Sequence, residues 1–150
     1  MNSEILQKLA RYCAYQERCV QELEQKMKTL EVLSSEFAEY LAWLSENNYL
    51  NEARFVEIFV RSKFNQKSWG RTKINYELRK RGISASLLAG AWDGIDDADY
   101  IEKARTLLKK KRDEIKSGTS PQRYQKCYNF GLSKGYESAL VRELLKPLFA

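Results

Sequence analysis

The sequence predicts an all-α protein of three tandem three-helix repeats, helix-turn-helix-like units stacked in an elongated, gently curved body. Three observations predict this fold. Apolar residues recur at the three- and four-residue spacing of an amphipathic helix along almost the whole chain. The 7 glycines and 2 prolines are too few for the frequent turns of an all-β protein. Two glycines that end helices, Gly82 and Gly135, lie 53 residues apart, which is typical of a repeat.

The first repeat is predicted over residues 1–50. Its apolar stripes predict two helices separated near residues 16–18, with Leu9 and Leu23 on their inner faces. The pair Ser34-Ser35 then opens a third helix, because serine favours the position before a helix start.

The second repeat is predicted over residues 51–94. Asn51 is a favourable N-cap for its first helix. The next helix begins near residues 68–70 and ends at Gly82, which can take the left-handed conformation found at helix ends. Ser84 then caps a short helix that is expected to carry Trp92.

The third repeat is predicted over residues 95–150. Its first helix starts near Asp96, with an acidic first turn that opposes the helix dipole, and is the longest in the chain. Ser120 and Pro121 read as an N-cap followed by proline at the first helical position. Gly135 ends this second helix, and a last apolar stripe continues to Phe149.

The residue types for catalysis or metal binding are largely missing. Histidine is absent, the three cysteines Cys13, Cys19 and Cys127 form no paired motif, and no glycine-rich phosphate loop occurs. We therefore expect no enzyme, no metal, no cofactor and no disulfide. The chain also lacks a long apolar run and a signal-peptide pattern, so we expect a cytoplasmic protein that does not enter a membrane. A monomer is expected because the stack of repeats ends in polar helices.

Positive charge is concentrated in the middle of the chain. Residues 1–50 hold five Lys or Arg against eight Asp or Glu, whereas residues 61–81 hold eight against one. Such a cluster favours an acidic surface or a nucleic acid, although a solvated helix face is the alternative. The predicted contact residues, which would also bind single- and double-stranded DNA weakly, are Arg61, Lys63, Lys67, Arg71, Lys73, Arg79, Lys80 and Arg81.

Two further features near positive charge stay open at this point. Trp69 lies inside the cluster and either packs at a helix start or stacks on a base or a partner. A second basic run, residues 109–112, either complements a helix C-terminus or belongs to a binding surface.

The central third carries one ordered motif, most of whose residues are expected to be structural: Tyr49, Leu50, Asn51, Arg54, Phe55, Gly70, Ile74, Glu77, Leu78, Gly82 and Ile83. This motif resembles the signature of the RecX family. Weaker similarity extends over nearly the whole chain. Two departures affect packing only: Cys19 weakens a helix cap, and Gly131 replaces a bulky apolar residue, which is expected to loosen the third repeat.

The resemblance implies a regulator that binds the RecA–DNA filament. It would mainly inhibit the recombinase's ATP hydrolysis, strand exchange and co-protease activity, in DNA recombination, DNA repair and the SOS response. The alternative is a stand-alone helix-turn-helix-like DNA-binding module, with Arg71, Lys73 and Asn75 as candidate base-reading residues.

Overall fold

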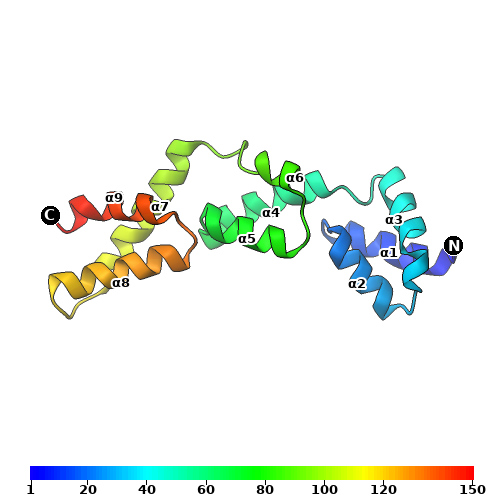
Figure 1. The fold of residues 1–150 in the computed structure, drawn as a ribbon, viewed down its shortest axis with the longest axis horizontal. Helices are drawn as coiled ribbons and strands as arrows, with labels where there is room; N and C mark the ends of the chain where they lie inside the picture. Colours follow the sequence, from blue (N-terminus) through cyan, green and yellow to red (C-terminus); the bar gives the residue numbers. More distant parts are fainter. The chain divides into compact units, whose positions relative to one another are not determined.

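The computed structural model describes all 150 residues and is entirely helical, as the sequence predicts. Figure 1 shows the succession of helices, and no residue forms a strand. The elements are α1 (Ser3–Tyr15), α2 (Val20–Thr29), the 3-10 turn η1 (Ser34–Glu36), α3 (Phe37–Glu46), α4 (Glu52–Lys67), α5 (Arg71–Lys80), α6 (Ala85–Ala89), α7 (Asp97–Glu114), α8 (Ser120–Ser133) and α9 (Ser138–Leu148).

The chain packs as two compact units. The N-terminal unit comprises residues 1–59 and 78–91, and the C-terminal unit comprises residues 60–77 and 92–150. The middle one of the three predicted repeats thus contributes residues to both units. The predicted boundaries of the three sequence repeats, at residues 1–50, 51–94 and 95–150, remain a prediction.

In the N-terminal unit, α1, α2 and α3 enclose a core of their own. Leu9, Leu23, Met27 and Leu44 are completely buried there, at the positions where the helical stripes predict an inner face. The cap of α2 is weak, as predicted, because Cys19 makes no side-chain cap bond. Glu52 of α4 compensates by accepting a hydrogen bond from the Val20 N–H at 3.0 Å.

In the C-terminal unit, α7, α8 and α9 pack against one another (Figure 1). The prediction that Gly131 loosens this packing is wrong. Gly131 is buried, and a Cβ there would lie 2.9 Å from the Val141 side chain and 3.1 Å from that of Leu108. The missing side chain lets α8 come close to the side chains of its two neighbours, so the glycine tightens the core.

Helix caps follow the sequence with three local differences. Ser34 and Ser35 lie in the 3-10 turn η1 rather than at the cap of α3, which follows Glu36 without a side-chain cap bond. Asn51, Ser84 and Asp96 cap α4, α6 and α7 through their side chains, as predicted. However, the N-cap of α8 is Thr119 rather than Ser120, because Thr119 and Gln122 form a reciprocal capping box. Trp92 lies beyond α6, which already ends at Ala89 with Gly90 as its C-cap.

Candidate partner-binding surface

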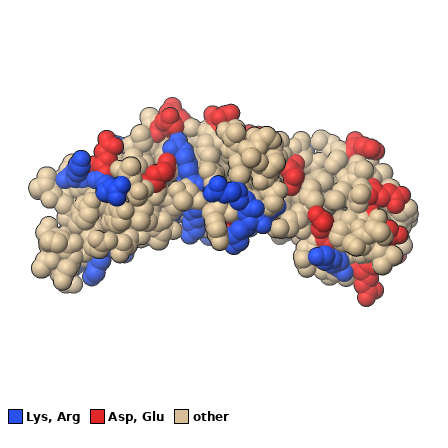
Figure 2. Space-filling model, in the orientation of Figure 1, with Lys and Arg blue, Asp and Glu red and all other residues tan.

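The predicted contact residues lie on α4, on α5 and on the turn that follows α5. Figure 2 shows Lys and Arg gathered over α4 and α5, whereas Asp and Glu predominate over α1 to α3. Arg79, Lys80 and Arg81 belong to the N-terminal unit, and the other five belong to the C-terminal unit. Four of the eight are exposed: Arg61, Lys67, Arg79 and Lys80. The remaining four are half-buried.

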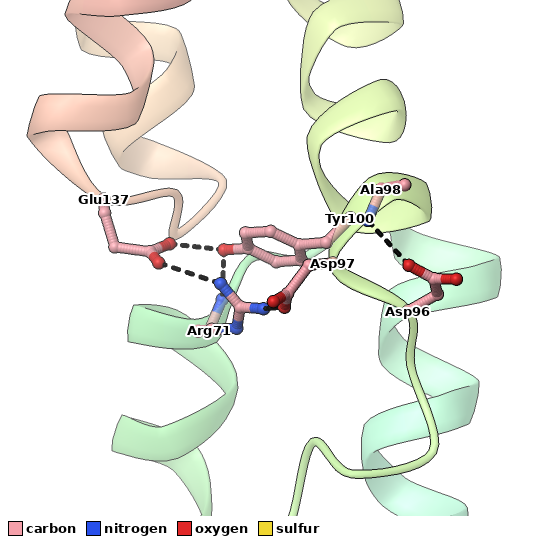
Figure 3. Close-up of polar contacts among 6 residues, drawn as sticks. All are labelled: Arg71, Asp96, Asp97, Ala98, Tyr100 and Glu137. Carbon is pink, nitrogen blue, oxygen red and sulfur yellow. Dashed lines mark hydrogen bonds and ion pairs between the residues drawn. The ribbon is translucent and has the colours of Figure 1, made fainter.

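Arg71, one of the half-buried residues, joins three helices of the C-terminal unit (Figure 3). It stands at the first position of α5, and its guanidinium pairs with Asp97 of α7 at 2.7 Å. A second pair, at 3.3 Å, reaches Glu137, the residue before α9. The same guanidinium lies 3.8 Å from the ring centroid of Tyr100, a cation–π contact.

Tyr100 completes this cluster (Figure 3). Its hydroxyl accepts a hydrogen bond from the Arg71 backbone N–H at 2.9 Å and donates one to Glu137. Because the tyrosine is fully buried, and because its hydroxyl donates a hydrogen bond to the Glu137 carboxylate, its pKa is raised above the usual value. The hydroxyl therefore stays protonated and keeps its role as donor throughout the neutral range.

The backbone on either side of Gly70 is also fixed. The Gly70 N–H donates to the Lys134 carbonyl at 2.7 Å, and the Thr72 N–H donates to the Gly135 carbonyl at 2.9 Å. The turn between α8 and α9 thus satisfies two N–H groups at the start of α5, which a helix cannot satisfy by itself. The two backbones lie so close that a Cβ at position 70 would overlap the backbone of Gly135, which explains the glycine there.

Trp69 lies between two lysines within the C-terminal unit. Lys63 Nζ is 5.0 Å and Lys73 Nζ is 4.5 Å from the centroid of its indole. Lys73 Nζ also lies 3.5 Å from the Ser133 carbonyl oxygen. The half-buried indole and two ammonium groups form an aromatic and basic face on the C-terminal unit.

In the N-terminal unit, the turn after α5 is held by its own contacts. Gln21 Nε2 donates to the Lys80 carbonyl at 3.1 Å, and the Arg81 guanidinium lies 4.9 Å from the ring centroid of Phe59. Gly82 adopts a φ of 74°, the left-handed conformation predicted for it at this helix end.

The residues that carry the family resemblance are mostly structural. Leu50, Phe55, Ile74, Leu78 and Ile83 are buried, and Tyr49 stacks on Trp43. Arg54 bridges elements of the N-terminal unit: it pairs with Glu17 and donates to the Asn48 carbonyl at 3.0 Å. Glu77 is half-buried on α5.

The candidate base-reading residues are held within the C-terminal unit. Asn75 Oδ1 accepts a hydrogen bond from the Trp92 indole N–H at 3.0 Å, and Arg71 faces two carboxylates. No group of three or more His, Cys, Asp or Glu side chains is placed to hold a metal ion. None of the helices is both long and apolar enough to span a bilayer.

The sequence does not point to Tyr100, Asp97 and Glu137 as partners of Arg71. They lie 26 to 66 residues from Arg71 along the chain, and no local spacing connects them. The only signal was an acidic first turn after Asp96, which helix capping already explained.

Fold and surface together define an all-helical protein of tandem three-helix units with a basic middle. Residues 51–91 match the second three-helix domain of RecX, and residues 97–145 match the third. The chain therefore belongs to the RecX family, as the central motif predicted.

Individual relatives agree with this assignment. The regulatory protein RecX of Clostridium perfringens (strain 13 / Type A) is 31% identical over 110 residues, which cover 72% of this chain and 51% of that protein. That of Oceanobacillus iheyensis is 23% identical over 137 residues, 91% of this chain and 50% of the relative. The chain thus spans about half the length of these relatives.

Solved structures support the fold. The crystal structure of RecX from Lactobacillus salivarius has a TM-score of 0.85 at 23% identity, covering 97% of this chain and 95% of that one. A second crystal structure of a regulatory protein RecX has a TM-score of 0.86 at 20% identity, covering 95% and 71%. Both show that the fold is that of RecX.

Proposed function

We propose that this chain is a cytoplasmic regulator that binds the RecA–DNA filament and mainly inhibits its ATP hydrolysis, strand exchange and co-protease activity. It would act in DNA repair, DNA recombination and the SOS response as a monomer that needs no cofactor and catalyses no reaction itself. The observation that carries the proposal is the match of residues 51–91 and 97–145 to two consecutive RecX domains.

Exposed basic residues on each of the two units supply the proposed contacts. A filament of recombinase on DNA is polyanionic, so exposed Lys and Arg increase both the rate of association and its salt sensitivity. Arg61, Lys67, Arg79 and Lys80 meet the requirement of exposure. Arg71 is a weaker candidate for contact, because its guanidinium would first have to leave two carboxylates.

The stand-alone DNA-reading module receives less support. A base-reading helix needs side chains that reach base edges from its N-terminal turns. On α5, all three candidates, Arg71, Lys73 and Asn75, already bond to other groups of the chain. We therefore do not propose sequence-specific DNA binding as a second function. It is the alternative that the following test would favour if the proposed function is wrong.

The test measures DNA-dependent ATP hydrolysis by RecA from the same organism, titrated with this chain. The native protein is compared with the double variant Lys67→Glu/Arg79→Glu, which reverses two exposed charges at the ends of α4 and α5. The matched control, Arg11→Glu/Lys28→Glu, makes the same change in net charge on the exposed surface of α1 and α2.

We expect the native protein and the control to lower the rate at substoichiometric amounts. The Lys67→Glu/Arg79→Glu variant should need about tenfold more protein, since each lost contact with a polyanion weakens binding and lowers the salt slope. If the native protein leaves the rate unchanged while it binds bare DNA, the proposed function is wrong and DNA binding becomes the leading account.

A further inference from the structure

A second basic surface lies on the third repeat, wholly within the C-terminal unit. The end of α7, the loop after it and one face of α8 enclose an open groove of about 600 Å³. Lys111, Lys116 and Lys126 line it, against a single acidic residue, Glu114. The surrounding segment, residues 102–134, holds ten Lys or Arg against three Asp or Glu.

The basic run of residues 109–112 does more than complement the end of α7. Lys111 turns toward α8, where its Nζ lies 5.0 Å from the ring centroid of Phe130. Arg112 turns elsewhere and donates to the Leu148 carbonyl at 3.2 Å. If the run only complemented the dipole of α7, Lys111 would not need to contact α8, and Arg112 would not need to contact the end of α9.

Phe130 places an aromatic ring among these charges. Its ring is half-buried in the groove wall, and a second ammonium group, that of Lys134, lies 5.8 Å from its centroid. Asn129 and Ser133, on the same face of α8, add polar groups along the groove. An aromatic ring set among flexible lysines is the arrangement by which proteins hold single-stranded nucleic acids.

We propose that this groove binds a single strand of nucleic acid, with phosphates at Lys111, Lys116 and Lys126 and one base against Phe130. An entering base displaces an ammonium group from the ring, and that group then pairs with the adjacent phosphate. A duplex fits less well because its bases are stacked inside and expose no face to the ring. Binding of nucleic acid in this groove does not require the recombinase, so the proposed site is tested independently of the proposed function.

The test measures the affinity of the full chain for a fluorescent 20-residue oligo(dT) by anisotropy, over a range of salt concentrations. The first variant is Lys116→Glu/Lys126→Glu, which changes two exposed groove lysines. Its control is Lys109→Glu/Lys146→Glu, two exposed lysines outside the groove lining. The second variant, Phe130→Leu, keeps an apolar side chain but removes the aromatic ring. Its affinity is also measured for an abasic oligonucleotide of the same length, which has phosphates but no bases to stack on the ring.

We expect the groove variant to bind oligo(dT) about tenfold more weakly or worse, with a salt slope shallower by about 1.4, while the control changes affinity less than about twofold. Phe130→Leu should weaken oligo(dT) binding at least about fivefold and leave binding of the abasic strand unchanged. The proposal is overturned if the groove variant and its control behave alike. It is also overturned if Phe130→Leu has no effect and polyglutamate competes as well as oligo(dT), because the groove would then be a site for an acidic protein.

Discussion

Replacing Gly70 with alanine tests how the start of α5 is held in the C-terminal unit. A Cβ at this position would lie 2.5 Å from the carbonyl carbon and oxygen of Gly135 and 2.6 Å from the backbone nitrogen of Tyr136. All three are backbone atoms, so no side-chain rotation can relieve the overlap. The two chain segments must separate, which breaks the bonds from Gly70 to Lys134 and from Thr72 to Gly135.

The loss of folding stability in Gly70→Ala can be estimated from these contacts. Overpacking of a well-packed site costs about 1–3 kcal/mol, and each of the two backbone hydrogen bonds contributes about 1 kcal/mol. The free energy of unfolding should therefore fall by about 3–5 kcal/mol. For a chain of this size that corresponds to a melting temperature lower by about 10 °C.

The assay is thermal and urea unfolding followed by far-ultraviolet circular dichroism. Gly94→Ala is the matched control, because a Cβ at Gly94 meets no atom within 4 Å and the residue needs no left-handed conformation. The control should lie within about 0.5 kcal/mol of the native protein. Equal unfolding midpoints for Gly70→Ala and Gly94→Ala would refute the packing argument.

Three further predictions concern stability. Arg71→Lys should lower the free energy of unfolding by about 1–3 kcal/mol in urea titrations, because an ammonium group cannot pair with two carboxylates and cover a tyrosine ring together; an unchanged midpoint would contradict this. Burial raises the pKa of the Cys13 and Cys19 thiols to about 11 from 9.0. Stability that is complete below pH 9 should thus fall by about 1 kcal/mol per thiol at pH 10, and Cys13→Ala/Cys19→Ala should remove much of this slope between pH 8.5 and 10. Gly131→Ala should destabilise by about 1–3 kcal/mol, since its Cβ would press on Val141; a stabilised variant would instead favour the looser packing expected from sequence.

The helices and their ends could be predicted from sequence because the signals are local. Apolar spacing located the inner faces, and the caps at Asn51, Ser84 and Asp96 formed as side-chain chemistry predicts. Two predicted caps were misplaced: Ser34-Ser35 form a 3-10 turn before α3, and Ser120 lies next to a residue that caps α8 better. Thr119 is the N-cap of α8 because it makes two hydrogen bonds with Gln122: its side chain accepts one from the Gln122 backbone N–H, and its own backbone N–H donates one to the Gln122 side chain.

Packing between distant segments could not be predicted. Gly70 and Gly135 stand 65 residues apart, and only the folded chain shows that their backbones touch. The same holds for Arg71, which local sequence marks as one more surface cation. Its carboxylate partners come from α7 and from the turn before α9. Gly131 was misjudged for the same reason, since its effect depends on which side chains face it.

The affinity of the chain for RecA assembled on single-stranded DNA, compared with the same DNA without RecA, tests the proposed function most directly. Both affinities are measured at one salt concentration near 150 mM, because binding to DNA alone changes steeply with salt. The account predicts tighter binding to the filament, and a loss of this preference in Lys67→Glu/Arg79→Glu but not in Arg11→Glu/Lys28→Glu. Equal or weaker binding to the filament than to bare DNA would contradict it.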